Sequence, residues 1–296
     1  MKNKKTIAIF ILFLLTLELY FSLDSISNNQ KIIFTFWEPK EKIPGYIKLC
    51  IKTWKKFLPD YTIYILDFKT AKELLGEKFF SKIICNNMLL MVQSDAIRVA
   101  ILNKFGGVWI DADTIILNDK ILKYFHSYEL AMIWEESVKL HYIAFIYALK
   151  KSTLIKQWKN HIIIKVKKYK EILYNKENTS NWLREWNKVN SWKYLGNSII
   201  EPLLKNTSGR KFIHKHSDDI KVCPELIYMS NSSLDNRQKY VQFYFSKLET
   251  KYVLNNNDGL IFLHNSWTPL KYKQMSDIEF LKQDILLSKL FAELLD

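Results

Sequence analysis

The chain has 296 residues, of which 48% are hydrophobic and 15% aromatic, and its formal net charge is +14. This length and apolar content suffice for one large core and exclude a low-complexity disordered chain, which would contain more than seven glycines and six prolines. The positive charge suits an anionic partner such as a membrane surface, a nucleic acid or a phosphorylated substrate.

The N-terminus, MKNKKTIAIFILFLLTLELYFSL, has three lysines followed by a mostly apolar stretch from Thr6 to Leu23. A bilayer-spanning helix needs about 20 apolar residues and at least about 17, so this stretch is just long enough. Because no small-residue cleavage site of the Ala-x-Ala kind follows, we expect an uncleaved membrane anchor over residues 1–23 rather than a signal peptide.

Strand-like and helix-like segments alternate from residue 31 onwards. The strand-like segments are rich in β-branched and aromatic residues and cover 31–37, 61–67 and 108–117. The helix-like segments cover 46–58, about 70–80 and 92–105. Pro59 ends the first helix and Gly106–Gly107 the last. This alternation is typical of an α/β fold with a parallel sheet.

The rest of the chain adds a helix-like region over about 150–193, a strand-like run over 259–267 and a final amphipathic helix over 276–295. Ser276 and Glu279 begin that helix with capping-box spacing. We expect it to pack on the core rather than to rest on the membrane. Residues 31–296 are therefore predicted to form one domain behind the anchor.

Two carboxylates interrupt the apolar segment GGVWIDADTIIL (106–117). Asp111 and Asp113 are two residues apart, so on a strand they would point to one face. In open α/β sheets, ligands bind beyond the carboxyl ends of the strands. A pair of carboxylates there suits Mg²⁺ or Mn²⁺, which bind through a few carboxylates plus substrate phosphates. An Asp-x-Asp pair also occurs often by chance.

The preceding helix contains a second charged pair, Asp95 and Arg98, which share one helical face. As a surface ion pair it would contribute little to stability. However, the whole stretch SDAIRVAILNKFGGVWIDADTII (94–116) resembles the DXD region of glycosyltransferase family 32. That family includes the initiating mannosyltransferases of yeast-type glycans and the capsular polysaccharide synthesis proteins, and the large glucosylating toxins share its core.

Three other segments extend the resemblance: KIIFTFWEP (31–39), CIKTWKKFLPDYTIYILD (50–67) and FLHNSWTP (262–269). YLGNSIIEP (194–202) lies where an acceptor-side glycine motif is often found in the family. The resemblance implies a GT-A fold, which is a Rossmann-like nucleotide-sugar-binding α/β fold.

The resemblance also implies donor-binding residues. Trp37 would stack on the base of the donor. Asp95 would hold the ribose, and Arg98 would hold the hydroxyl groups of the donor sugar. Ser266 and Trp267 would approach the diphosphate.

A metal ion, Mn²⁺ or Mg²⁺, is implied as the cofactor. Asp111 would contact both the ribose and the metal, Asp113 would chelate the metal, and His264 would complete the metal site. Asp111, Asp113 and Arg98 would be the catalytic residues, because the metal neutralises charge on the leaving nucleoside diphosphate. One departure is Trp109, where the family commonly has Tyr. A hydroxyl is lost and bulk is gained, so the sugar pocket is expected to differ.

The implied reaction is a retaining hexosyl transfer. UDP-galactose or UDP-glucose is the first expected donor and GDP-mannose the second, with a glycan or lipid-linked oligosaccharide as acceptor in surface or capsular polysaccharide synthesis. A retaining glycosidase uses a carboxylate nucleophile. Glu201 is the one candidate, and a surface helix charge is its preferred interpretation. Front-side displacement is therefore expected.

The sequence gives conflicting indications of the side of the membrane that the domain faces. The lysines place the body across the membrane, as in a Golgi enzyme, and sequons at Asn178, Asn206 and Asn231 fit this arrangement. The missing stem and unpaired cysteines suit a bacterial inner-membrane enzyme that works at the cytoplasmic face, which we favour. The cysteines, Cys50, Cys85 and Cys223, are spaced neither as a zinc knuckle nor as a redox pair. We expect all three to be buried small side chains.

Two other classes of function remain open. WIDADTI (109–115) also matches the motif of haloacid-dehalogenase-type phosphatases, with Asp111 as nucleophile and Asp113 as general acid. That motif normally opens its domain, which it does not do here. A non-enzymatic, membrane-anchored basic module that binds nucleic acid or anionic glycans would explain the net charge but not the two aspartates. The glycosyltransferase interpretation expects no nucleic acid partner.

Overall fold

The computed structural model describes most of the chain after residue 30. The described residues are 31–136, 138–174, 187, 189, 191, 193–205, 207, 211–254 and 259–296. The membrane anchor predicted over residues 1–23 lies outside them. Of the helices in the described ranges, none combines the length and the hydropathy that crossing a membrane requires.

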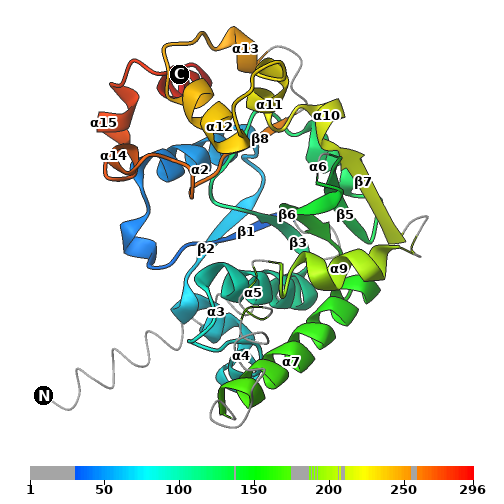
Figure 1. Ribbon diagram of the computed structural model, residues 1–296. Helices are drawn as coiled ribbons and strands as arrows, with labels where there is room; N and C mark the ends of the chain where they lie inside the picture. The colour runs from blue at the N-terminus through cyan, green and yellow to red at the C-terminus, as the bar shows by residue number, and fades with distance from the viewer. Residues whose placement is uncertain are drawn as a thin grey trace, which may run out of the picture.

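A six-stranded sheet runs through the middle of the domain in the order β2-β1-β3-β6-β5-β7 (Figure 1). Its strands are β1 (Ile32–Phe36), β2 (Thr62–Leu66), β3 (Gly107–Ile110), β5 (Leu130–Glu135), β6 (Leu140–Ala148) and β7 (Phe212–His216). A second, two-stranded sheet consists of β4 (Thr114–Ile116) and β8 (Leu260–Phe262).

The α/β class is confirmed, but the sheet is mixed rather than parallel. β1 is parallel to both β2 and β3, whereas β6 is antiparallel to β3 and β5. Strands β5 and β6 follow each other directly in the chain, and antiparallel pairing is the arrangement that a short connection permits. β7 then adds parallel to β5 at the edge.

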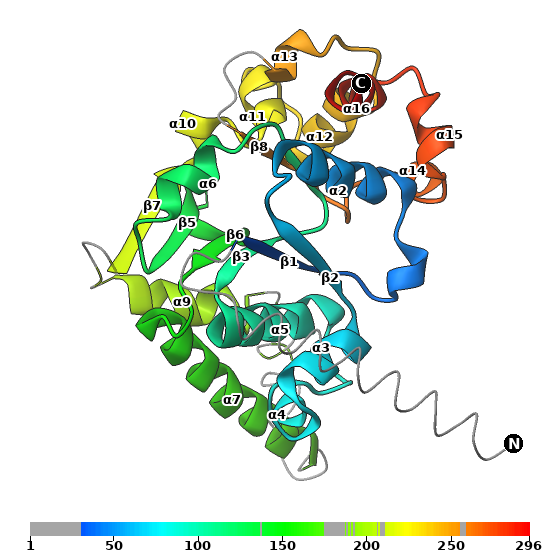
Figure 2. The same ribbon diagram turned by 180° about the vertical axis from the view of Figure 1, so that it is seen from behind.

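Helices cover both faces of this sheet (Figures 1 and 2). On one side lie α3 (Phe68–Leu75), α4 (Glu77–Ile83), α5 (Leu90–Phe105), α7 (Thr153–Tyr174) and α9 (Asn197–Leu204). On the other lie α2 (Gly45–Phe57), α11 (Pro224–Tyr228), α12 (Asn236–Tyr244), α13 (Lys251–Leu254), α14 (Leu270–Lys273), α15 (Asp277–Leu281) and α16 (Leu286–Leu295). Short elements are η1 (Lys40–Lys42), α6 (Lys120–Phe125) and α10 (Ser217–Ile220).

The central strands supply side chains to two separate cores, because neighbouring residues of a strand point to opposite faces. Ile33 and Val108 belong to the core that contains α2 and α16. Phe34 and Trp109 belong to the core that contains α5 and α7. Burial on both faces explains why these strands are continuous apolar runs in the sequence. Each such side chain contributes about 1.5–3 kcal/mol by its burial.

Two predicted helices are each divided in two. The stretch 70–80 breaks at Gly76, whose φ of 84° is a left-handed conformation that does not continue a helix. The final stretch 276–295 breaks between α15 and α16, where Ile285 is extended. Its capping box of Ser276 and Glu279 is confirmed. α16 packs in the core, as expected.

The cysteines agree with expectation at two of three positions. Cys50 and Cys223 are buried, whereas Cys85, which follows α4, is partly exposed. All three lie in the described part of the chain, and none of them forms a disulfide there.

Gly106 and Gly76 provide a matched test of backbone strain. Both have positive φ, 73° and 84°, but only at Gly106 would an added Cβ meet backbone, 2.5 Å from the nitrogen of Lys150. Gly76→Ala is therefore expected to lower the free energy of unfolding by about 1 kcal/mol, and Gly106→Ala by about 2–4 kcal/mol. Urea unfolding of the two variants checks the difference, and equal losses would contradict it.

Candidate active site

The two aspartates lie where the chain passes from one sheet to the other. β3 ends at Ile110, and Asp111 still donates its N–H to the carbonyl of Ala144 on β6 at 2.8 Å. The N–H of Thr114 then bonds to the carbonyl of Asp111 at 3.0 Å, which closes a turn before β4 begins. The prediction of one strand over 108–117 is therefore wrong in its middle. Asp111 and Asp113 are turn residues at a strand end, and they need not share a face as strand neighbours would.

Asp111 is held by two hydrogen bonds to one oxygen. Its Oδ1 accepts from Nη2 of Arg98 and from the indole Nε1 of Trp109, both at 2.7 Å. The guanidinium also lies over the Trp109 ring, with Cζ 5.1 Å from the ring centroid. Trp109, which departs from the family pattern, therefore supplies an N–H that orients the first aspartate.

Asp95 and Arg98 form a buried pair on α5 rather than a surface pair. They are 4% and 3% exposed, and Nη1 of Arg98 lies 3.1 Å from Oδ1 of Asp95. Burial raises the pKa of Asp95 to about 7, with Arg98 opposing and Asp111 adding to the shift. Nε of Arg98 has no hydrogen-bond partner among the described residues, and Nη1 has the ion-pair contact with Asp95 but no hydrogen bond of regular geometry. Buried donors of this kind are expected to find a partner when a ligand binds.

Gly196, directly before α9, lies against the side chain of Asp95. A Cβ at this position would lie 2.8 Å from Oδ2 of Asp95 and 2.6 Å from Cδ1 of Ile143. Only glycine fits there without displacing these side chains. The glycine-containing segment 194–202 is thus brought against the predicted ribose-binding residue.

Asp113 is tied to the segment that follows β8. Its carbonyl accepts from the N–H of Leu263 at 2.9 Å, and its Oδ2 accepts from the N–H of Asn265 at 2.8 Å. Burial, followed by the charge of Asp111, raises the pKa of Asp113 to about 7. These bonds place His264 beside the second aspartate, as the sequence predicted.

A cavity of about 220 Å³ brings Asp111, Asp113 and His264 together. Three lining polar residues were not predicted, namely Glu135, His141 and Asn197. They come from β5, β6 and the first residue of α9. Asn197 directly follows Gly196 in the family-like segment, which is the one signal in the sequence that pointed to any of the three.

The donor set of this cavity fits a divalent cation. Burial and then the charge of Asp111 raise the pKa of Asp113, and a cation would relieve the repulsion between the two carboxylates. Burial lowers the pKa of His264 to about 4, so its imidazole is neutral and able to ligate at physiological pH. Oxygen ligands with one imidazole suit Mn²⁺ or Mg²⁺.

Five of the predicted residues are not among those that line this cavity: Asp95, Arg98, Trp37, Ser266 and Trp267. Trp37 is half-buried at the end of β1, where its N–H bonds to the carbonyl of Leu66 at 2.9 Å. Ser266 is exposed, and Trp267 packs its ring against His264 with the centroids 4.0 Å apart. Their donor-binding roles remain predictions.

A larger cavity of about 1040 Å³ shares Leu140 and His141 with the first. Trp134, Phe212 and Glu201 are also among its lining residues. Oε1 of Glu201 accepts from the backbone N–H of His141 at 2.7 Å, and Oε2 of Glu201 lies 3.0 Å from Nδ1 of the His141 imidazole. The interpretation of Glu201 as a plain surface charge is therefore wrong. It is half-buried and orients the histidine between the two cavities.

Comparison with known proteins gives one family. The family described as "Capsular polysaccharide synthesis protein" matches residues 17–258. No curated protein matches the chain closely enough to be counted as a relative.

Among solved structures, the PaToxG glycosyltransferase is 19% identical with a TM-score of 0.36, over 69% of this chain and 79% of that one. The apo form of the glycosyltransferase GlyE from Streptococcus pneumoniae TIGR4 is 12% identical with a TM-score of 0.39, over 90% and 64%. A second GlyE structure is 10% identical with a TM-score of 0.39, over 89% and 64%, so this chain spans less than two thirds of GlyE. These TM-scores are too low to support an argument, and the assignment rests on the family match.

Proposed function

Because the chain belongs to the family of capsular polysaccharide synthesis proteins, we propose that it transfers a hexose from a nucleotide sugar to a saccharide acceptor. The prediction of a glycosyltransferase is confirmed at the level of the family, and the hexose, the donor and the acceptor belong to the proposal. The observation that carries the finer proposal is that Asp111 and Asp113 line the same cavity. We propose further that the described domain is a GT-A domain, since the aspartates follow a central parallel strand.

In this proposal Asp111 and Asp113 hold Mn²⁺ or Mg²⁺. When bound, the ion neutralises negative charge on the leaving diphosphate. The protein orients both ligands in advance: Arg98 and Trp109 hold Asp111, and the N–H of Asn265 holds Asp113. These two residues carry the metal proposal, because His264 has a second set of neighbours, described below.

Arg98 is proposed to bind the donor sugar. Its Nη2 donates to Asp111 at 2.7 Å and its Nη1 lies 3.1 Å from Asp95, whereas its Nε has no hydrogen-bond partner among the described residues. A sugar hydroxyl group would satisfy Nε. The two ion pairs hold the guanidinium in place.

We propose that the transfer retains configuration by front-side displacement. Double displacement would need a carboxylate nucleophile at the sugar. Among the described residues that line the smaller cavity, Glu135 is the carboxylate besides the two aspartates. A Glu135→Gln variant that retains turnover would support front-side displacement, whereas a variant rescued by an added anionic nucleophile would support a covalent intermediate.

The larger cavity is the proposed acceptor site. It adjoins the smaller one through His141, and the rings of Trp134 and Phe212 suit the apolar faces of sugars. A glycan or lipid-linked saccharide is the acceptor that such a surface fits, in surface or capsular polysaccharide synthesis.

A donor screen tests the proposed function. The full chain, purified in detergent, is incubated with UDP-galactose, UDP-glucose or GDP-mannose, and release of UDP or GDP is measured. We expect release from a UDP-sugar first and from GDP-mannose second. No release from any of them, with hydrolysis of p-nitrophenyl phosphate instead, would favour the phosphatase alternative.

Trp37→Ala is expected to raise the KM for the donor about tenfold. An aromatic face contributes about 1–3 kcal/mol of stacking per base, and about 1.4 kcal/mol corresponds to a factor of ten. Steady-state kinetics at varied donor concentration measure the change. An unchanged KM in a folded variant would mean that Trp37 is an ordinary packing residue.

We also propose that residues 1–23 anchor the domain to a membrane, with the bacterial inner membrane favoured over a Golgi membrane. Removal of residues 1–23 is expected to move the protein from the membrane fraction to the supernatant without loss of folding, because described structure begins near Lys31. Fractionation and circular dichroism check this. A truncated chain that cannot fold would show that the segment belongs to the core.

A further inference from the structure

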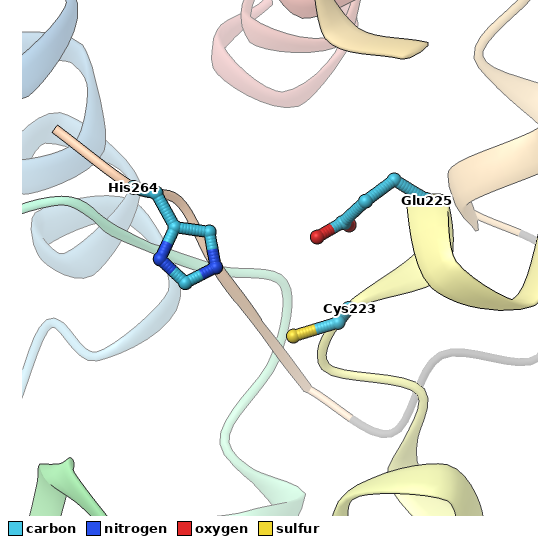
Figure 3. Close-up of side chains that lie close together, drawn as sticks. All are labelled: Cys223, Glu225 and His264. Atoms are coloured by element: carbon cyan, nitrogen blue, oxygen red, sulfur yellow. The ribbon is translucent and has the colours of Figure 1, made fainter. Parts of the chain in front are cut away.

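Three potential metal ligands from two distant segments meet beside the smaller cavity (Figure 3). They are Cys223, Glu225 and His264, and their ligand atoms all lie within 4.8 Å of one another. Cys223 directly precedes α11, and Glu225 is in its first turn. A hydrogen bond from the N–H of Phe262 to the carbonyl of Val222, at 2.9 Å, joins the two segments.

Only one of the two carboxylate oxygens of Glu225 accepts a hydrogen bond from another described side chain. The residue is completely buried, and its Oε2 accepts from the hydroxyl of Tyr244 at 3.1 Å. Its Oε1 has no hydrogen-bond partner among the described residues. A buried polar atom without a partner is costly, and an ion is one of the partners that explain such an atom.

We propose that Cys223, Glu225 and His264 bind a Zn²⁺ ion that is distinct from the ion at Asp111 and Asp113. Thiolate sulfur, carboxylate oxygen and imidazole nitrogen are the three zinc ligand types, whereas Mg²⁺ takes oxygen. Binding releases the thiol proton of Cys223 to solvent, because zinc is ligated by the thiolate. Three protein ligands leave one position of a tetrahedral site for water.

The orientation of His264 agrees with this assignment. One ring nitrogen faces Cys223 and Glu225, and the other is turned away from them (Figure 3). A neutral imidazole has one nitrogen that can accept a metal. In this proposal His264 ligates the zinc instead of completing the metal site at the aspartates, as the resemblance had implied, and the metal there is held by Asp111, Asp113 and the diphosphate.

The zinc would fasten α11 to the segment after β8. That segment includes Asn265, whose N–H holds Asp113. Zinc removal is thus expected to loosen a support of the proposed catalytic carboxylate. Only this consequence rests on the proposed function, since the site itself follows from the three side chains.

Cobalt substitution tests the site. Co²⁺ replaces Zn²⁺ at such sites and gives a thiolate-to-cobalt charge-transfer absorption when sulfur is a ligand. The full chain, purified in detergent, reduced and stripped of metal, is titrated with Co²⁺. We expect that absorption to saturate at one equivalent and to disappear in Cys223→Ser. Cys85→Ser, the matched control at a partly exposed cysteine, should keep it. No thiolate absorption in the parent protein, or its survival in Cys223→Ser, would overturn the proposal.

Glu225→Gln covers the case in which Cys223→Ser does not fold, since it keeps the sulfur and the size of the side chain. Competition with a chromophoric chelator is expected to show zinc affinity lowered tenfold or more. An unchanged affinity would overturn the site.

The zinc site and the metal site at Asp111 and Asp113 can be refuted independently of each other. Asp113→Asn should keep the thiolate absorption, because Asp113 is not a zinc ligand here. Manganese-dependent turnover without thiolate absorption would refute the zinc site and leave the transferase proposal standing. Thiolate absorption without manganese-dependent turnover would refute only the transferase proposal.

Discussion

Asp113→Asn is expected to lower kcat by a factor on the order of 10³ or more. The substitution removes one negative charge from the pair that is proposed to hold the metal, while the side chain keeps its size and one oxygen. Charge stabilisation of the leaving diphosphate amounts to several kcal/mol, and each 1.36 kcal/mol corresponds to about a factor of ten in rate. Turnover at saturating donor measures the effect.

Asp119→Asn is the matched control. Asp119 is also an aspartate of this region, but its side chain is 41% exposed and pairs with Lys123 at 2.7 Å. We expect its kcat to stay within a factor of two or so of the parent, since surface pairs contribute about 0–1 kcal/mol. An Asp113→Asn enzyme as active as this control would remove Asp113 from the mechanism.

Arg98→Met is expected to lower the free energy of unfolding by about 3–5 kcal/mol, because loss of one member of a buried ion pair leaves an uncompensated charge. Asp95 is 4% exposed and has Arg98 at 3.1 Å, and Asp111 depends on the same guanidinium. Methionine keeps most of the apolar length of the arginine. Urea denaturation followed by tryptophan fluorescence gives the free energy.

Two further variants, Lys123→Met and the double variant Arg98→Met with Asp95→Asn, distinguish the cost of losing a buried ion pair from that of losing an exposed one. Lys123 forms an ion pair of 2.7 Å with its side chain 72% exposed, so its loss should cost less than about 1 kcal/mol. Adding Asp95→Asn to Arg98→Met should recover part of the loss, because the buried charge is then gone. If Arg98→Met lowers the free energy of unfolding by no more than Lys123→Met does, the ion pairs of Arg98 are not a buried, coupled network.

The position of the site could be predicted because it depends on local patterns. Apolar runs lead into Asp111 and His264, so both had to emerge where strands leave the core. The helical spacing of Asp95 and Arg98 placed them on one face of α5. The turn at 111–113 was missed, because the chain changes sheets there. That change depends on the pairing of β4 with β8, in which Ile115 lies opposite Ile261, 146 residues further along the chain.

The remaining lining residues depend on long-range pairing that local patterns do not specify. His141 and Glu135 lie on β6 and β5, whose antiparallel insertion between β3 and β7 makes the sheet mixed. Their positions follow from that insertion and from the contact of Glu201 with His141. No spacing rule joins positions so far apart.

The role of Trp109 and the cluster of Cys223, Glu225 and His264 could not be predicted from local patterns. Trp109 was noticed as a departure from the pattern of the resembled family, but its hydrogen bond to Asp111 is seen only in the folded chain, where Trp109 is buried. Cys223 and Glu225 have no spacing typical of a metal motif, and only the fold brings them to His264.

A metal ion held by Asp111 and Asp113 is proposed to drive transfer from a nucleotide sugar. Nucleotide release from the best donor, measured with the full chain in EDTA and after Mn²⁺ is restored, tests this dependence most directly. We predict no turnover in EDTA, recovery with Mn²⁺, and no recovery in Asp113→Asn at the same Mn²⁺ concentration. Full turnover in EDTA would contradict this dependence on a metal.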